Sequence, residues 1–146
     1  MAAVVRYQRA IMRPKKQEPT KAEPAPKTGR CAVIVAAYHA QKWIKPCIAS
    51  IRSQVLPPGW TLDLRIGVDG CAETAAALTR MKESYYLAPD NVGTYVLRNS
   101  LIGLGPADCY TIFDADDEML PTYLATGIMG AGSNGLAGAA RSSPLP

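Results

Sequence analysis

Acidic residues that follow a short apolar run are the strongest candidates for chemistry in this chain. Four of the five residues from Asp114 to Glu118 are acidic. Two like charges about 4 Å apart repel by roughly 4 kcal/mol at an effective dielectric constant near 20, and a divalent cation would relieve that repulsion. Mg²⁺ and Mn²⁺ take oxygen ligands, and Mg²⁺ binds one or two carboxylates together with water and substrate phosphates. In an extended segment alternate side chains share a face, so Asp114 and Asp116 would form such a pair.

A second interpretation of the same residues stays open at this point. Carboxylates favour helix N-termini, and proline is suited to the first turn of a helix. The acidic residues could therefore form a solvated turn that caps a short helix from Pro121 through Met129. To decide between the two interpretations, we ask which other residues the fold is expected to place beside the acidic ones.

Three apolar segments predict β-strands. Residues 31–37, CAVIVAA, form a continuous apolar run, which is typical of a strand covered on both faces. Residues 61–68, TLDLRIGV, alternate, which predicts a strand with a more exposed second side. The bulky residues Tyr110, Ile112 and Phe113 predict a buried strand that leads into the acidic residues.

Helical spacing of apolar residues predicts helices between these strands. The first covers residues 41–55, and a short Ala-rich helix covers residues 73–82. After a loop at 89–93, a third helix begins near Thr94, carries Leu97, Leu101 and Leu104 on one stripe, and ends at Gly105-Pro106.

This alternation of strands and helices predicts an α/β fold with three layers and a mainly parallel sheet. In such sheets ligands bind outside the carboxyl ends of the strands. The polar residues 38–39, 69–70 and 114–117 each follow a predicted strand, so they are expected on a single rim. Three such segments together favour a ligand site over a solvated turn.

The charge of the chain is unevenly distributed. Residues 1–30 contain eight of the 16 Lys and Arg residues but two of the 12 acidic residues, whereas the whole chain has a net charge of +4. We expect a disordered basic tail over 1–30, a domain over 31–130 and a flexible Gly/Ala/Ser/Pro tail over 131–146. The basic tail could solubilise the protein or bind an acidic protein or an anionic membrane, and nucleic acid is not its expected partner.

The remaining composition indicates a soluble, cytoplasmic protein. No apolar run reaches the ~18 residues of a membrane span. The four cysteines are widely spaced and His39 is the single histidine, so neither a zinc site nor a disulfide framework is expected. The cysteines are predicted to be buried apolar residues.

Five segments, in order, resemble glycosyltransferase family 2, whose catalytic domain has the GT-A fold. They are AVIVAAYHAQKWIKPCIASIRSQ, VDGCAE, NVG, LRNSLIGLG and FDADDEMLP. The chain departs from the family pattern at Ala36, His39, Val68 and Cys71. The resemblance covers the nucleotide-sugar-binding part of the family, over residues 31–124.

The resemblance implies a role for each matching residue. Asp114 and Asp116 form the DxD motif, which holds a divalent metal, Mn²⁺ or Mg²⁺, against the diphosphate of a nucleotide sugar, most often a UDP-sugar. Asp116 is implied as the metal ligand, and Asp114 as touching the metal or the ribose. Binding roles are implied for four further residues. Tyr38 lines the base pocket, Asp69 accepts hydrogen bonds from the base or ribose, and Asn91 lies in the loop beside them. Arg98 reaches a phosphate or pairs with an acidic residue.

The resemblance implies two competing functions. In the family the acceptor half and the catalytic base lie beyond the acidic motif, and residues 125–146 contain no carboxylate, so no catalytic residue is assigned. The first hypothesis is a glycosyltransferase whose acceptor half is supplied elsewhere. The alternative is a non-catalytic nucleotide-sugar-binding or structural protein derived from such an enzyme.

Overall fold

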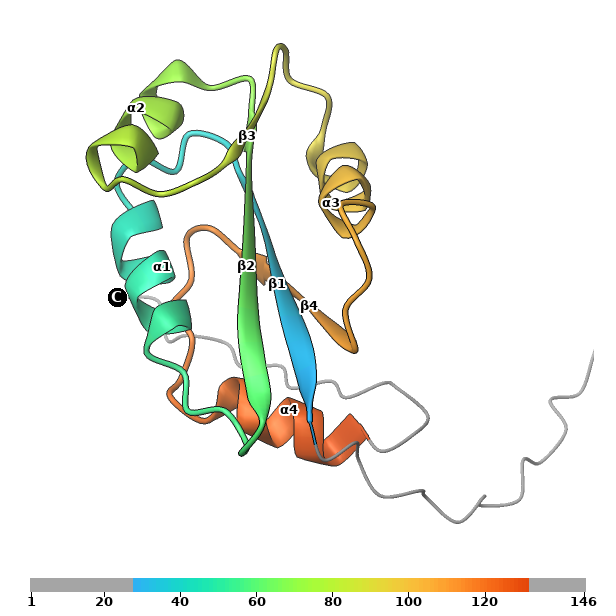
Figure 1. Ribbon diagram of the computed structural model, residues 1–146. Coiled ribbons are helices and arrows are strands. Elements are labelled where there is room, and N and C mark those ends of the chain that lie inside the picture. Colours follow the sequence, from blue (N-terminus) through green and yellow to red (C-terminus); the bar gives the residue numbers. More distant parts are fainter. Residues whose placement is uncertain (1–27, 132–146) are drawn as a thin grey trace, which may run out of the picture.

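Strands and helices alternate along the chain, as the apolar pattern predicts (Figure 1). The computed structural model describes residues 28–131. Its elements are β1 (Gly29–Ala37), α1 (Ile44–Arg52), β2 (Trp60–Asp69), α2 (Ala72–Arg80), β3 (Tyr86–Ala88), α3 (Thr94–Ile102), β4 (Cys109–Asp114) and α4 (Tyr123–Ala131).

The four strands form one parallel sheet in the order β3-β2-β1-β4. β1 pairs with β2 along its whole length, and with β4 from Cys31↔Cys109 to Ala36↔Asp114. The predicted α/β fold with a parallel sheet is therefore confirmed, with β1 in the interior of the sheet.

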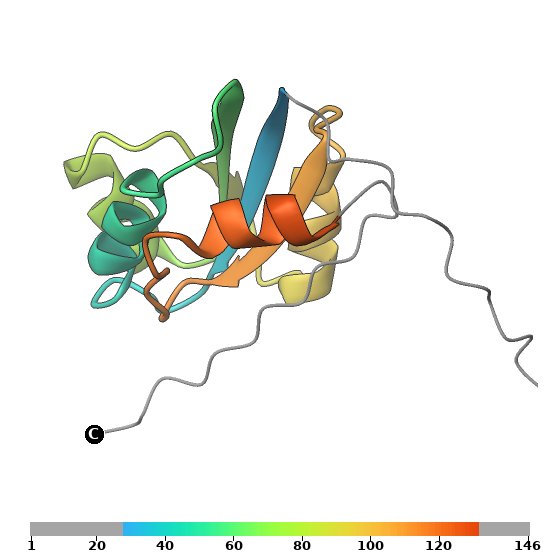
Figure 2. The same cartoon turned by 90° about the horizontal axis from the view of Figure 1, so that it is seen from below.

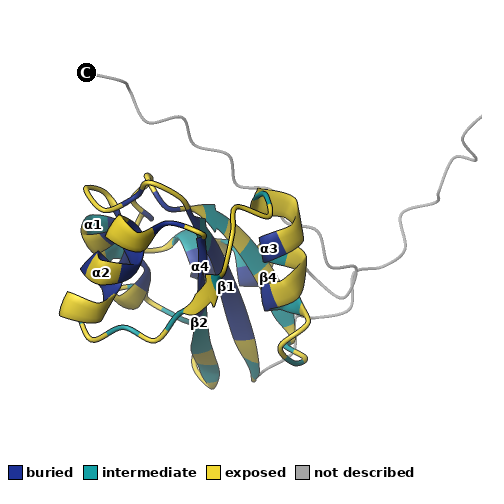
Figure 3. Cartoon of the chain, turned by 90° about the horizontal axis from the view of Figure 1, so that it is seen from above, coloured by how far each residue is buried: buried dark blue, intermediate teal, exposed yellow. Residues whose placement is uncertain are grey.

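Helices cover both faces of this sheet. Figures 1 and 3 show α1 and α2 on one face and α3 on the other, with the outer surfaces of the helices exposed. Figure 2, seen from below, shows α4 lying across the strands. Leu124 and Ile128 of α4 belong to the same apolar core as the buried residues of α1 and α2. The three-layer arrangement follows from this distribution.

β1 forms the centre of the core because both of its faces are apolar. Residues Cys31–Val35 are fully buried. Ala32 and Ile34 pack against Leu97 and Leu101 of α3, while the alternate residues face the core formed with α1 and α2. The continuous apolar run at residues 31–37 is therefore explained as predicted: the strand is covered by helices on both faces.

α3 lies close to β2, which corrects one expectation. A Cβ atom at Gly67 would lie 2.9 Å from the side chain of Leu97, so glycine permits this approach. Arg65 on the same face is buried, and its guanidinium group donates to the carbonyl of Leu101 at 3.0 Å and to the Asp63 carboxylate at 2.8 Å. The second side of β2, predicted to be more exposed, is therefore covered here by α3.

The prediction that Tyr110 and Ile112 are buried is wrong. Their exposed fractions are 41% and 50%, because β4 is one of the two edge strands among the described residues and α3, on this face of the sheet, covers mainly β1 and β2. Phe113, on the opposite face, is partly buried and makes an edge-on contact with the Tyr123 ring.

The helix boundaries also differ from the predicted ones. Residues 41–43 form a turn, so the first helix begins at Ile44, and Val55 lies beyond its end and is exposed. α3 ends at Ile102, which leaves Leu104 outside the buried stripe. No strand was predicted at β3, which has three residues, two of them exposed.

The predicted tails fall largely outside the described residues. β1 begins at Gly29, two residues before the predicted start of the domain, and α4 ends at Ala131. Residues 1–27 and 132–146 lie outside the described part of the chain. Within the described part, none of the helices has the length and apolar character needed to cross a membrane.

Candidate functional site

Three strand ends contribute residues to one rim of the sheet. β1 ends at Ala37, β2 at Asp69 and β4 at Asp114. Because the strands are parallel, the segments that follow them lie at the same edge, where α/β sheets bind ligands. The register places Asp114 beside Ala36 of the interior strand.

Asp69 holds the loop that follows β3 against the end of β2. Its carboxylate is buried, with 3% of the residue exposed, and accepts hydrogen bonds from the backbone N–H groups of Val92 at 2.7 Å and Gly93 at 3.1 Å. Each oxygen therefore already accepts one protein donor. A direct hydrogen bond from Asp69 to a base or ribose stays a prediction.

Gly70 allows the same loop to approach the rim. Its φ angle of 65° lies in the left-handed region, and an added Cβ would lie 2.5 Å from the carbonyl carbon of Asp90 and 2.6 Å from the nitrogen of Asn91. The side chain of Asn91 is exposed at this contact. Asp69 and Gly70 together bring the Asn91–Gly93 loop to the rim.

The acidic residues form a turn at the end of β4. The N–H of Asp117 donates to the carbonyl of Asp114 at 3.3 Å, and Ala115 is buried inside the turn. The alternation expected for an extended segment therefore ends at Asp114, because Asp116 already lies in the turn. Asp114, Asp116, Asp117 and Glu118 are all exposed.

Arg98 connects α3 to this turn. Its guanidinium group forms an ion pair with the carboxylate of Asp114. The Arg98 side chain is 17% exposed, against 60% for Asp114. Its Nε atom is buried without a hydrogen-bond partner among the described residues. The ion pair thus leaves part of the guanidinium group unsatisfied.

The acidic turn perturbs its neighbours electrostatically. Burial, followed by the carboxylates of Asp116 and Asp114, raises the pKa of Asp117. Burial, followed by the acidic residues with Asp117 foremost, raises the pKa of the Cys47 thiol to about 12. The turn is therefore a region of negative potential.

Ser50 of α1 and Gln54, two residues after its end, hold the segment that follows the acidic turn. The sequence patterns did not reveal these contacts. The Ser50 hydroxyl accepts the N–H of Met119 at 2.8 Å. The Gln54 amide donates to the carbonyl of Leu120 at 2.6 Å and accepts the N–H of Leu124 at 3.1 Å. These contacts position the chain between the acidic turn and α4.

A second polar group lies where β1 and β2 end. Tyr38 is half exposed, and its ring lies 4.2 Å from that of His39, measured between centroids. His39 Nδ1 lies 3.6 Å from Sγ of Cys71, which lies 3.3 Å from a carboxylate oxygen of Glu73. A hydrogen bond from its own N–H, then one from the Cys71 thiol, lowers the pKa of Glu73.

The acidic turn offers two exposed carboxylates of the oxygen-ligand type that hard divalent cations take, one of which, Asp114, is also paired with Arg98. Asp114 and Asp116 present exposed oxygen ligands in a region of negative potential, as such ions require. Among the described residues, the group of three whose ligand atoms all lie within 4.8 Å of one another is His39, Cys71 and Glu73 rather than the acidic turn. A cation at the turn would therefore need water or phosphate oxygens to complete its shell.

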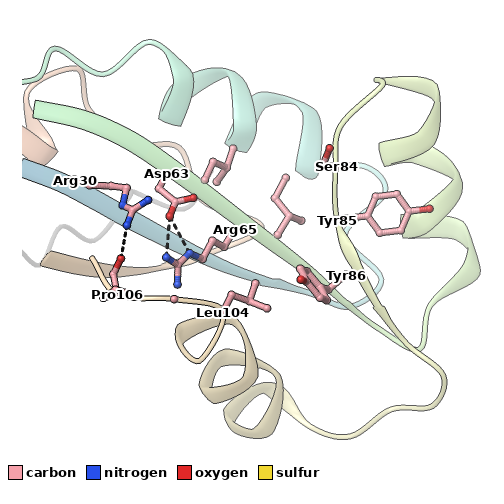
Figure 4. Close-up of a pocket in the computed structure, with 11 residues that line it drawn as sticks. Arg30, Asp63, Arg65, Ser84, Tyr85, Tyr86, Leu104 and Pro106 are labelled. Carbon is pink, nitrogen blue, oxygen red and sulfur yellow. Dashed lines mark hydrogen bonds and ion pairs between the residues drawn. The ribbon is translucent and has the colours of Figure 1, made fainter. Parts of the chain in front are cut away.

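A groove runs along β2 from the amino end of β1 to β3 (Figure 4), and its lining includes none of the rim residues 38–39, 69–70 and 114–117. Its volume is about 540 Å³, and its lining includes Arg30, Asp63, Arg65 and Pro106. Arg30 donates to the carbonyl of Pro106 at 2.6 Å, and Arg65 is paired with Asp63. Since these cations already have partners within the chain, the groove is a weaker ligand site than the rim.

Known proteins resemble this chain in structure. Neither the protein-family models nor the curated proteins contain a match to the sequence. The mannosyltransferase PcManGT from Pyrobaculum calidifontis, in complex with GDP-Man and Mn²⁺, is similar with a TM-score of 0.62 and 19% identity over 80% of this chain and 35% of that chain.

TarS from S. aureus is similar in two ligand complexes. The complex with UDP has a TM-score of 0.57 and 19% identity over 65% of this chain and 30% of that chain. The complex with UDP-GlcNAc has a TM-score of 0.53 and 18% identity over 61% and 27%. The chain thus has the GT-A-like α/β fold of these glycosyltransferases, and spans about a third or less of their length.

Proposed function

We propose that this domain binds a nucleoside diphosphate sugar through a divalent cation held by Asp114 and Asp116. The observation that carries the proposal is the position of the acidic turn, which follows β4 on the same rim as the loop held by Asp69. A cation bound there, Mn²⁺ or Mg²⁺, would neutralise charge on the diphosphate. The complexes of the similar structures with nucleotide sugars or nucleotides support this assignment.

Arg98 would contribute to the same anionic ligand. Its buried Nε–H lacks a partner among the described residues, and an unsatisfied buried donor costs about 1–3 kcal/mol. A ligand oxygen that reaches Arg98 would relieve this cost. The ion pair with Asp114 would meanwhile hold that carboxylate at the edge of the site.

The other rim residues would form the nucleoside end of the site. Tyr38 presents a half-exposed ring suited to stacking on a base. Asp69 would act by holding the Asn91–Gly93 loop in place, and Asn91 would present its exposed amide to the nucleoside. We propose a uridine nucleotide as the first ligand to test.

The activity that follows from this binding is glycosyl transfer, with the acceptor side supplied by further chain or by a partner. A cation at the acidic turn would stabilise the negative charge that develops on the leaving nucleoside diphosphate. The second candidate is a binding module without turnover. It makes the same binding prediction as the transferase and differs from it only in turnover.

A thermal-shift screen tests the binding proposal. The full chain is melted with UDP, GDP and their sugar conjugates, each with Mn²⁺ and with a chelator. Ligand at 100 times its Kd stabilises a fold by about 2.7 kcal/mol, which is a readily measured shift. A shift that requires Mn²⁺ is expected, whereas the absence of any metal-dependent shift would reject the proposal.

Turnover then separates the two candidate functions. Release of UDP from a UDP-sugar in Mn²⁺, abolished by Asp116→Asn, would identify a transferase or hydrolase. Binding without turnover, alone or with a partner that supplies the acceptor, would identify the binding module.

A further inference from the structure

Three metal-ligand side chains converge where β1 and β2 end, and none of them belongs to the acidic turn. They are His39, Cys71 and Glu73, and their ligand atoms all lie within 4.8 Å of one another. The residues come from two segments, because His39 follows β1 while Cys71 and Glu73 lie at the start of α2. The cluster is thus assembled by the fold, which is why spacing along the sequence did not reveal it.

The two separations that involve Cys71 are close to those of neighbouring ligands around one tetrahedral ion, and the ligand atoms of His39 and Glu73 lie within 4.8 Å of each other. With Zn–S near 2.3 Å and Zn–N or Zn–O near 2.0–2.2 Å, tetrahedral angles place neighbouring ligand atoms about 3.4–3.6 Å apart. The observed distances are 3.6 Å from Cys71 Sγ to His39 Nδ1 and 3.3 Å from Cys71 Sγ to Glu73. An ion bound to Cys71 could therefore reach His39 or Glu73 with little movement of either side chain.

The surroundings hold the three ligands in place. His39 has a φ angle of 50°, a left-handed conformation uncommon outside glycine and often found at functional sites. The fully buried Thr74 hydroxyl accepts the N–H of Ala40 at 3.0 Å and lies 3.3 Å from Cys71 Sγ, to which it can donate. A hydrogen bond to a ligand sulfur is a typical outer-shell contact of metal sites.

We propose that His39, Cys71 and Glu73 bind a borderline-soft divalent ion, Zn²⁺, with a fourth position open to solvent. One thiolate, one imidazole and one carboxylate suit Zn²⁺, whereas an oxygen-only turn suits Mg²⁺ or Mn²⁺. Cys71 is buried on the protein side, while His39 and Glu73 are exposed, so water completes the shell. The ion would fix the loop after β1 to the start of α2.

This ion would also act on the neighbouring rim. The Tyr38 ring lies against His39, so coordination of His39 would immobilise the half-exposed ring as well. The zinc site does not depend on the proposed nucleotide site, because the two use different residues and different classes of metal.

Cobalt substitution tests the site in the full, reduced chain. Co²⁺ in a tetrahedral site with a thiolate gives intense ligand-field bands and a sulfur-to-metal charge-transfer band. We expect one equivalent of Co²⁺ to produce both kinds of band, and Zn²⁺ to displace the Co²⁺.

Two variants test the assigned ligands. Cys71→Ser should abolish the charge-transfer band. His39→Asn, which keeps a residue tolerant of the left-handed conformation, should weaken Zn²⁺ binding by more than about tenfold, since even outer-shell changes cost roughly 10–100-fold.

Two controls separate this site from other metal binding. Cys109→Ser removes a thiol at the amino end of β4, and Asp116→Asn removes a carboxylate of the acidic turn, so both should keep the band. No charge-transfer band in the folded wild-type chain, or a band that survives Cys71→Ser, would overturn the proposal.

Discussion

Replacing Asp69 with asparagine should release the loop at the rim and destabilise the domain. The residue is 3% exposed, and its carboxylate accepts hydrogen bonds from the N–H groups of Val92 at 2.7 Å and Gly93 at 3.1 Å. Asparagine keeps one acceptor oxygen but turns an NH₂ group toward the other N–H. At least one hydrogen bond to a charged group is lost, which costs about 1.5–3 kcal/mol. For a domain of this size each 1 kcal/mol lowers Tm by roughly 4–8 °C.

The matched control is Asp90→Asn, which makes the same chemical change at an exposed position of the same loop. It should change the free energy of unfolding by no more than about 0.5 kcal/mol. Urea unfolding measures both variants, and hydrogen exchange at the amides of Val92 and Gly93 reports the loop directly. Exchange should accelerate in Asp69→Asn and stay unchanged in Asp90→Asn. Equal stability and equal exchange in the two variants would refute the role assigned to Asp69.

Three further predictions concern other contacts. Gln54→Leu removes the amide that holds the backbone of residues 120 and 124 and should cost about 1–3 kcal/mol in urea unfolding, whereas the exposed Ser53→Ala should stay within about 0.5 kcal/mol of wild type. Gly70→Ala should lower Tm because its Cβ would meet the backbone at 2.5 Å, whereas Gly127→Ala, in open space on α4, should raise stability by up to about 1 kcal/mol. Burial, followed by the hydrogen bond with the Cys31 thiol, raises the pKa of Cys109 from 9.0 to about 12, so the folded state keeps this thiol protonated at pH values where the unfolded chain ionises it. The free energy of unfolding should therefore fall as pH rises from about 9 to 12, and Cys109→Ala should flatten that slope. An unchanged slope in this variant would contradict the last prediction.

Much of the fold was predictable because it rests on local apolar patterns. The continuous run at residues 31–37 identified a doubly covered strand, and the alternation at 61–68 identified its neighbour. Exposure of Tyr110 and Ile112 was not predictable, since it depends on α3 packing over β1 and β2 and leaving this face of β4 uncovered. The sequence pattern indicates apolar character but does not show which strand a helix leaves uncovered.

The rim was predictable in outline and not in its contacts. Parallel strands place their carboxyl ends at one edge, so the grouping of the segments after β1, β2 and β4 followed from topology. The hydrogen bonds of Asp69 to the Val92 and Gly93 amides bridge more than 20 residues and have no signature in either segment. His39 and Cys71 likewise follow two different strands and lie far apart in the sequence. A search for closely spaced Cys and His residues therefore misses their contact.

The most direct test of the nucleotide site is calorimetric titration of a nucleoside diphosphate, with Mn²⁺ present, into wild type, Asp116→Asn and Glu118→Gln. Both substitutions remove one negative charge from the acidic turn, but only Asp116 is assigned as a cation ligand. We predict that binding requires Mn²⁺ and that Asp116→Asn weakens it at least about 100-fold, or roughly 2.8 kcal/mol, while Glu118→Gln changes it much less. Binding that persists without Mn²⁺, or that is equal in the two variants, would contradict the assignment of the acidic turn as the cation site.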